Sequence, residues 1–194
     1  MRFNACERAR RVSTATISRR YSALPRTLLI GRDSLIADGA RARTFGRAGE
    51  RIVALEEFFT GPGRTVLKAD ELVTEIIVPP PLPRTGKVYL KHGRRKAMEL
   101  ATVGVGVSLT LQKDICQEVR IVLGAVAPTP IRARRVEELL RGKNLNDSLI
   151  AKAAAAAMSE SRPISNVRGS AEYRREMVAV LTRRALSQAL NLVQ

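Results

Sequence analysis

The sequence is poor in the residue types that build metal sites, disulfide scaffolds and stacking surfaces. Its 194 residues include no tryptophan, two cysteines and one histidine, and aromatic residues make up only 4%. Cys6 and Cys116 are far apart and form no CxxC or Cys/His cluster, which excludes a cysteine-ligated zinc or iron–sulfur site within this chain. The same cysteine usage supports no disulfide scaffold and fits a reducing compartment, so we expect a cytoplasmic protein.

Long apolar runs are absent as well. No stretch approaches the roughly 18 consecutive apolar residues of a membrane-spanning helix, so we expect no membrane span. Hydrophobic residues still make up 45% of the chain, which is ordinary for a globular protein and argues against wholesale disorder.

Positive charge is what the sequence has in excess. Lys and Arg number 34 against 18 Asp and Glu, a formal net charge of +16. Residues 1–51 hold twelve arginines, no lysine and four acids, so half of the excess lies in about a quarter of the chain. Three interpretations are open for this segment: an arm that binds nucleic acid through its phosphates, a transit peptide, or a start of the chain that is not a working element.

The hydrophobic pattern predicts no element before about Arg51. After it, residues 52–55 are predicted as a short strand and residues 56–59 as a helical turn that ends in a Gly/Pro loop. Residues 71–78 are rich in β-branched side chains and are predicted as a strand. The proline-rich segment PPPLPRTG at 79–86 cannot continue a central ladder, and it marks the predicted domain boundary.

The second half of the chain is predicted as strands followed by helices. Residues 102–111 alternate valine or leucine with glycine, serine or threonine, a period of two that is typical of a half-buried strand. Further strands are predicted at 87–91 and 118–126, and helices at 132–140, 148–158 and from Ser170 onwards, with Arg174, Arg175, Arg183 and Arg184 facing water. This order predicts an α+β fold, a small antiparallel sheet with helices packed on one side.

No catalytic group can be assembled from the residue types alone. The one histidine, His92, stands in a polar turn and has no nucleophile to serve. The GVG at 104–106 begins like a dinucleotide fingerprint, but it lies in a strand and no helix follows it. The basic run of Lys91, Arg94, Arg95 and Lys96 is compatible with binding phosphate or an anionic cofactor, and equally with a solvated turn.

Several motifs in one order nevertheless resemble a known family, the FAD-binding medium subunit of molybdenum hydroxylases of the carbon monoxide dehydrogenase and xanthine dehydrogenase type. The motifs are FFTGPGRT at 58–65, DELVTEIIVP at 70–79, YLK at 89–91 with RR at 94–95 and ATVG at 101–104, GAVAPTPIRA at 124–133, and RPISNVRGSAEYR at 162–174. The resemblance runs from about Arg51 to the C-terminus.

This resemblance implies an electron-transfer flavoprotein subunit. In the family, electrons pass from a molybdenum cofactor on a large subunit through two [2Fe–2S] clusters on a small subunit to FAD on this subunit, and then to an acceptor. The implied partners are therefore a molybdopterin-binding large subunit and a [2Fe–2S] small subunit. The implied organisation is an unassigned basic segment at 1–50, the remnant of an FAD-binding domain at 51–80, a linker at 81–86 and a C-terminal α+β flavoprotein domain at 87–194.

The resemblance also implies which residues contact the flavin. Tyr89 and Lys91 match the family's flavin-side Tyr-x-Lys, and a cation near the ring would stabilise the anionic reduced flavin. Leu72 and Val73 match an apolar position near the ring, and Thr102 is a further neighbour. Glu99 stands where an aspartate is commoner in the family.

The N-terminal part departs from the family pattern. The two Gly-rich loops that hold the FAD pyrophosphate in the family are absent from this sequence, and FNAC at 3–6 only echoes the family's turn. This departure suggests that the chain is a truncated subunit whose residues from about 6 to 50 are read out of frame. The alternative is a basic module that binds nucleic acid or an acidic partner through residues 1–51. For the basic run at 91–96, single-strand nucleic-acid binding is weakly supported, because Tyr89 is the only aromatic residue near it.

Overall fold

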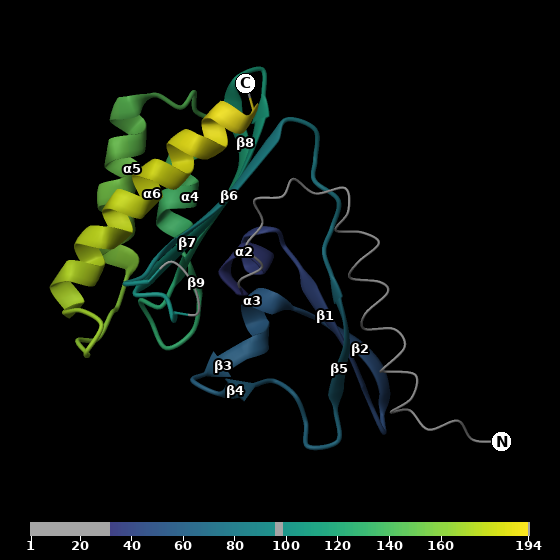
Figure 1. Ribbon diagram of the computed structural model, residues 1–194. Coiled ribbons are helices and arrows are strands. Elements are labelled where there is room, and N and C mark those ends of the chain that lie inside the picture. The colour runs from purple at the N-terminus through teal and green to yellow at the C-terminus, as the bar shows by residue number, and fades with distance from the viewer. Residues whose placement is uncertain (1–31, 96–98, 194) are drawn as a thin grey trace.

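The computed structural model describes residues 32–95 and 99–193, which form two packed units (Figure 1). The smaller unit, residues 32–77, is built from helices α2 (Arg32–Ala37) and α3 (Leu55–Phe58) and five strands. The strands are β1 (Arg41–Gly46), β2 (Gly49–Ala54), β3 (Phe59–Gly61), β4 (Arg64–Thr65) and β5 (Leu72–Ile77). They make a three-stranded sheet in the order β2-β1-β5 and a small β3-β4 ribbon.

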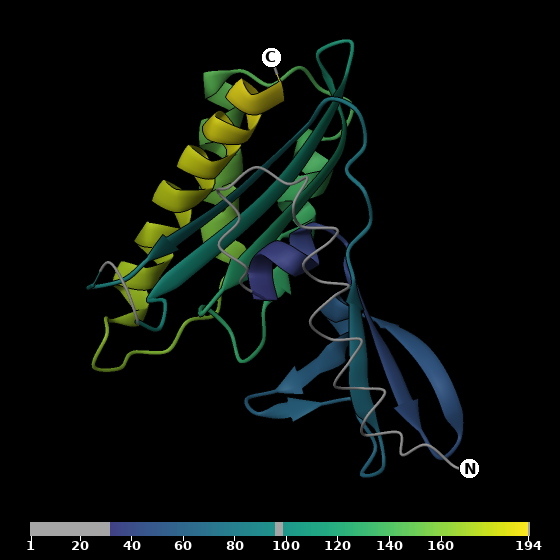
Figure 2. The same cartoon turned by 45° about the vertical axis from the view of Figure 1, so that its right-hand side comes forward.

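The larger unit is a four-stranded antiparallel sheet with three helices. Its strands are β6 (Thr85–His92), β7 (Val103–Gln112), β8 (Ile115–Gly124) and β9 (Ile131–Arg132), and they pair in that order. Helices α4 (Arg134–Leu140), α5 (Asp147–Glu160) and α6 (Ala171–Val193) cover one face of this sheet (Figures 1 and 2). The predicted α+β fold is confirmed. No helix within the described ranges is long and apolar enough to cross a membrane.

The helix ends follow the side chains that the sequence places there. Asn146 caps α5 by accepting a hydrogen bond from the Leu149 amide at 2.8 Å, and Ser170 accepts one from the Tyr173 amide at 3.1 Å before α6. The alanines of α5 allow it to pack closely, so Ala153 and Ala157 are fully buried. Arg175, Arg183 and Arg184 are exposed as predicted, whereas Arg174 is 4% exposed and the prediction that it faces water is wrong.

The four-stranded sheet has two contrasting faces. The valine face carries Val103, Val105, Val107 and Leu109 of β7 together with their partners on β8, and α4–α6 bury it in the main core. The glycine face carries Gly104, Gly106, Ser108 and the β8 residues Gly124, Val122 and Arg120. Helix α2 lies against this second face (Figure 2).

Two predictions about these regions were therefore wrong. The chain forms α2, β1 and the start of β2 before Arg51, in a stretch where too few apolar residues recur for periodicity to show. Strand β7 is buried on both faces and not half-buried, because α2 covers the small residues that sequence alternation assigned to solvent. Residues 1–31, to which most of the basic-segment interpretations apply, lie outside the described residues.

Candidate functional site

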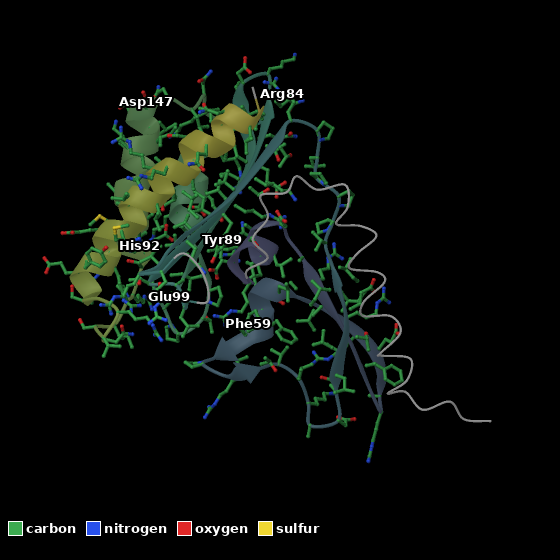
Figure 3. The ribbon with its side chains drawn as sticks, viewed as in Figure 1. Phe59, Arg84, Tyr89, His92, Glu99 and Asp147 are labelled. Carbon is green, nitrogen blue, oxygen red and sulfur yellow. The ribbon has the colours of Figure 1, made fainter. Side chains whose placement is uncertain are left out.

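Tyr89 is the first candidate residue, and it lies where the two units meet. Because it pairs with Gly106 in the β6–β7 register, its side chain extends on the glycine face beside α2 (Figure 3). The Tyr89 hydroxyl donates a hydrogen bond to Asp33 Oδ2 at 3.3 Å. Burial, and then the charge of Asp33, raise the pKa of the Tyr89 phenol well above its usual value, so the ring stays neutral.

Asp33 is a buried carboxyl group that sequence reasoning missed. It is 7% exposed, and burial raises its pKa above the ordinary value, an effect that the hydrogen bond from Tyr89 opposes. A Cβ atom added at Gly124 would lie 1.9 Å from Asp33 Oδ2, and one added at Gly106 would lie 2.9 Å from the Asp33 carbonyl oxygen. The missing side chains are thus what let α2 approach the sheet closely.

Lys91 continues the same face two residues after Tyr89. It pairs with Gly104, and its Nζ donates to the Glu99 carbonyl oxygen at 3.1 Å. The Glu99 carboxylate accepts a hydrogen bond from the Arg95 amide and so closes the turn after β6. Lys91 therefore presents a cation at the edge of a face that also carries a neutral aromatic ring.

His92 anchors the end of β6 to α6, and it does not act as a base for a nucleophile. Its Nε2 lies 2.9 Å from the Tyr173 hydroxyl at the start of α6 (Figure 3). Of the basic run predicted to bind an anion, Arg94 and Arg95 are exposed, and Lys96 lies outside the described residues. Thr102 is 1% exposed and its hydroxyl has no partner among the described residues.

Leu72 and Val73 lie apart from this pair. They belong to β5, are 58% and 38% exposed, and are paired with Phe45 and Thr44 of β1. Among the described residues, β5 pairs with β1 and belongs to a different sheet from β6. The structure thus groups Tyr89 with Lys91 and leaves Leu72 and Val73 in the other unit.

Ion pairs fix the two units against each other, and none of them is visible in the sequence. Lys87 Nζ lies 2.9 Å from Asp38 Oδ1, with both side chains largely buried. Arg132 bridges Glu56 of the smaller unit at 3.0 Å and Glu137 of α4 at 2.5 Å. These contacts hold α2 and α3 in place, and with them the Asp33 carboxyl group beside Tyr89.

Two of the five arginines of residues 32–51 form ion pairs within the smaller unit. Arg43 contacts Glu50 and Glu75, and Arg51 contacts Glu71. The hydrogen bond from Arg51 lowers the pKa of Glu71 to about 2. Charge that is paired inside the fold is not free to bind phosphate, so Arg43 and Arg51 give no support to a nucleic-acid arm.

Comparisons with known proteins divide the chain at the same place as the structure. Residues 33–81 match the FAD binding domain in molybdopterin dehydrogenase, and residues 88–189 match the CO dehydrogenase flavoprotein C-terminal domain. The first match begins at residue 33, so the interpretation of residues 33–50 as an out-of-frame reading is wrong. The rest of that proposed misreading, before residue 32, lies outside the described residues.

Individual relatives agree with these matches. The glyceraldehyde dehydrogenase medium chain of Sulfolobus acidocaldarius is 38% identical over 141 residues, 73% of this chain and 50% of the relative. The carbon monoxide dehydrogenase medium chain of Afipia carboxidovorans is 36% identical over 151 residues, 78% of this chain and 52% of the relative. This chain therefore spans about half the length of the curated relatives it matches.

A solved structure shows the same fold. Carbon monoxide dehydrogenase from Hydrogenophaga pseudoflava, in a form that lacks the Mo-pyranopterin moiety of the molybdenum cofactor, superposes with a TM-score of 0.79 at 33% identity. The match covers 82% of this chain and 55% of that chain. With a family domain matching more than half of its residues and the fold in agreement, this chain belongs to the family of FAD-binding medium subunits of carbon monoxide and xanthine dehydrogenases.

Proposed function

We propose that this chain is the FAD-binding electron-transfer component of a molybdenum hydroxylase, one that passes electrons from iron–sulfur clusters to FAD and an acceptor. The observation that carries the proposal is the pair of family matches, 33–81 and 88–189, which follow each other in one chain and meet in space where Asp33 contacts Tyr89. The proposed partners are a molybdopterin-binding large subunit and a [2Fe–2S] small subunit, in the cytoplasm.

The residues present on the glycine face fit the reactive part of a flavin. Tyr89 offers an aromatic ring whose phenol stays neutral, because burial and the nearby Asp33 charge raise its pKa. Lys91 offers an ammonium group on the same face. A neutral ring and a nearby cation suit a cofactor that becomes anionic on reduction, since the cation offsets the new charge.

Each residue has a defined role in the proposal. FAD, when bound, supplies the redox chemistry by accepting electrons and passing them on. Tyr89 would lie against the ring, held in orientation by Asp33, and Lys91 would stand near its polar edge. Leu72 and Val73 would add apolar contact from β5, where both side chains are accessible.

Flavin loading tests the proposal. The full chain, produced together with the large and small subunits, is incubated with FAD and separated from free cofactor, and its visible flavin absorbance is measured per chain. We expect stoichiometric flavin, and about a tenfold weaker affinity for Lys91→Met because a charge-assisted contact contributes roughly 1.5–3 kcal/mol. Lys152→Met, which removes an exposed lysine of α5, is the matched control. Absence of flavin from the wild-type assembly would contradict the proposal.

A further inference from the structure

A cavity of about 240 Å³ lies on the glycine face, at the opposite end of β6 from Lys91. Strands β6, β7 and β8 form its floor, and the segment from α2 to β1 and the linker before β6 form its walls. Figure 1 shows this linker passing from β5 to the start of β6 on the side of the sheet where α2 lies. Both units and the linker between them therefore line one cavity, which we call the linker cavity.

The floor of the linker cavity is polar at each strand position that lines it. The antiparallel register places six polar side chains in two rows across the strands: Lys87, Ser108 and Arg120 in one row, and Thr85, Thr110 and Glu118 in the other. All six are buried or partly buried. Polar groups that leave water cost stability unless they find partners, so a covered floor of this kind suits a polar occupant.

Contacts within the chain satisfy only part of this polarity. They join Lys87 to Asp38, Arg120 to Glu118, and Thr85 to Thr110. A lysine ammonium has three N–H donors and an arginine guanidinium has five, so both cations keep donors beyond these contacts. The Ser108 hydroxyl, between the two cations in its row, has no hydrogen-bond partner among the described residues.

The smaller unit adds a further cation and makes room for Arg120. A Cβ atom at Gly39 would lie 2.0 Å from Arg120 Nη1, and Gly39 has a φ of +71°, a conformation that favours glycine. Arg41 lines the same cavity, is exposed, and forms no ion pair within the described parts of the chain. The charged lining residues are Arg41, Lys87 and Arg120 against Asp38 and Glu118. This surplus of positive charge and of donors favours an anion.

The volume of the linker cavity narrows the choice of anion. It corresponds to about eight water molecules, at the ~30 Å³ that each occupies in the liquid. Pockets that take drug-sized ligands measure roughly 300–1,000 Å³, so this cavity does not enclose a nucleotide or a coenzyme. The two carboxylates in the lining, Asp38 and Glu118, would repel a purely anionic ligand but would accept a hydrogen bond from a hydroxyl group.

We propose that the linker cavity is a binding site for a small hydroxy acid, a carboxylate that carries a neighbouring hydroxyl group. The ligand carboxylate would accept hydrogen bonds from Arg41 and Arg120, whose forked donors match its two oxygens. The ligand hydroxyl would accept from Ser108 and donate to Glu118. Since the lining comes from both units, the bound acid would also stabilise their packing against each other.

Isothermal titration calorimetry of the full chain with L-malate tests the proposal. We expect a Kd below about 1 mM for wild type. Arg41→Met should raise the Kd by at least about tenfold, because it removes a charge-assisted contact. Ser108→Ala should raise it by about threefold, as expected for the loss of one neutral hydrogen bond. Malate should also raise the thermal unfolding midpoint of wild type, and by less for Arg41→Met.

Arg47→Met is the matched control, since Arg47 is an exposed arginine of the β1–β2 turn that does not line the cavity. Its Kd for malate should equal that of wild type. Because Arg41 is exposed and unpaired within the described residues, Arg41→Met should unfold at the wild-type midpoint when no ligand is present. No binding heat with malate up to about 10 mM, or a Kd for Arg41→Met within about twofold of wild type, would overturn the proposal.

Two further probes separate the hydroxy acid from simpler ligands. Inorganic phosphate has the negative charge without the hydroxylated carbon chain, and glycerol has the hydroxyl groups without the charge. We expect both to bind at least about tenfold more weakly than malate. Phosphate that binds as tightly as malate would mean that the cavity selects charge alone, and glycerol that does so would mean that it selects hydroxyl groups alone. Either result would overturn the assignment of a hydroxy acid.

Discussion

The two faces of the four-stranded sheet are built on opposite principles. The valine face fills space: its β-branched and leucine side chains pack against α4–α6, and Val105, Leu109 and Ile121 are fully buried. The glycine face leaves space free, and α2 occupies it with the carboxyl group of Asp33 over Gly124 and its backbone over Gly106. The valine face is stabilised by the packing of large apolar side chains. The glycine face is stabilised by the close approach of α2 to the strands and by a few polar contacts.

This difference explains why the proposed site lies on the glycine face. A face packed with large apolar side chains has no room for a polar constellation, whereas small residues allow Asp33 and Asp38 to reach the strands beside Tyr89 and Lys87. Buried polar groups cost stability unless they are paired. We therefore expect the valine face to carry most of the stability and the glycine face to carry the function.

The largest expected effect is on the valine face. Leu109→Ala should lower the free energy of unfolding by about 3 kcal/mol, because Leu109 is fully buried and its removal leaves a cavity. Ser108→Ala, the adjacent change on the glycine face, should stay within about 0.5 kcal/mol of wild type. Urea unfolding followed by circular dichroism measures both. Equal losses of stability in the two variants would contradict the view that the valine face carries most of the stability.

A smaller loss is expected when the ion pair of the glycine face is broken. Lys87→Met leaves Asp38 buried without its counter-charge and should cost about 2 kcal/mol. Adding Asp38→Asn removes the buried charge and should restore part of that loss. Lys152→Met on exposed α5 is the control, and its unfolding midpoint should match that of wild type. No recovery in the double variant would show that the pair does not act through charge.

The next variant tests whether Asp33 needs the space that Gly124 leaves on the glycine face. Gly124→Ala places a methyl group where Asp33 lies, since its Cβ would be 1.9 Å from Oδ2, and overpacking of this kind costs about 2 kcal/mol. Asp33→Ala in the same chain removes the clash, so the two losses should fall short of their sum by about 1 kcal/mol. Gly61→Ala, whose Cβ meets its nearest atom at 3.9 Å, is the control. Strict additivity would show that Asp33 does not need the space.

The smallest expected effect is a pH dependence of stability. Burial raises the folded pKa of Asp33 above its ordinary value of 3.8, so the folded state holds the proton more tightly than the unfolded chain does. The free energy of unfolding therefore falls as pH rises from near 3.8 through the folded pKa. Asp33→Asn should lack this fall. The free energy of unfolding of the variant, relative to that of wild type, should therefore increase as pH rises from near 3.8 through the folded pKa of Asp33.

Urea unfolding at a series of pH values measures that difference. Asp114→Asn, on the exposed turn between β7 and β8, shows what removal of a surface carboxylate does by itself. A difference between Asp33→Asn and wild type that is constant with pH would mean that the Asp33 carboxyl does not titrate differently in the two states.

Sequence reasoning located the C-terminal elements well. The alternation of residues 102–111 and the return strand after Gln112 gave the β7–β8 hairpin, and Asn146 and Ser170 marked the starts of two helices. It failed before Arg51, because β1 places arginine and threonine among its few apolar residues, and only pairing with β2 and β5 makes it a strand. It also misplaced Arg174, since a helical arginine reads as exposed unless a partner such as Asn166 is known.

The candidate site was predicted only in part. The Tyr-x-Lys pattern of the family resemblance pointed to Tyr89 and Lys91, and the structure has both on the glycine face. Their contact with flavin stays a proposal, as does that of Leu72 and Val73. Asp33 was not found, although a signal was present: glycines at alternate positions of a strand can mean that another backbone approaches that face.

By itself the sequence determined the order of the main strands and helices of the larger unit, the valine side of its sheet, and the family through its short motifs. Each of these depends on residues that are close together in the sequence. Only the tertiary structure decided what covers the glycine side. Asp33 and Tyr89 are 56 positions apart, and no local pattern links them. They meet because three glycines leave room for α2 and because ion pairs from Asp38 and Glu56 hold the two units together, and such contacts depend on the whole chain being folded.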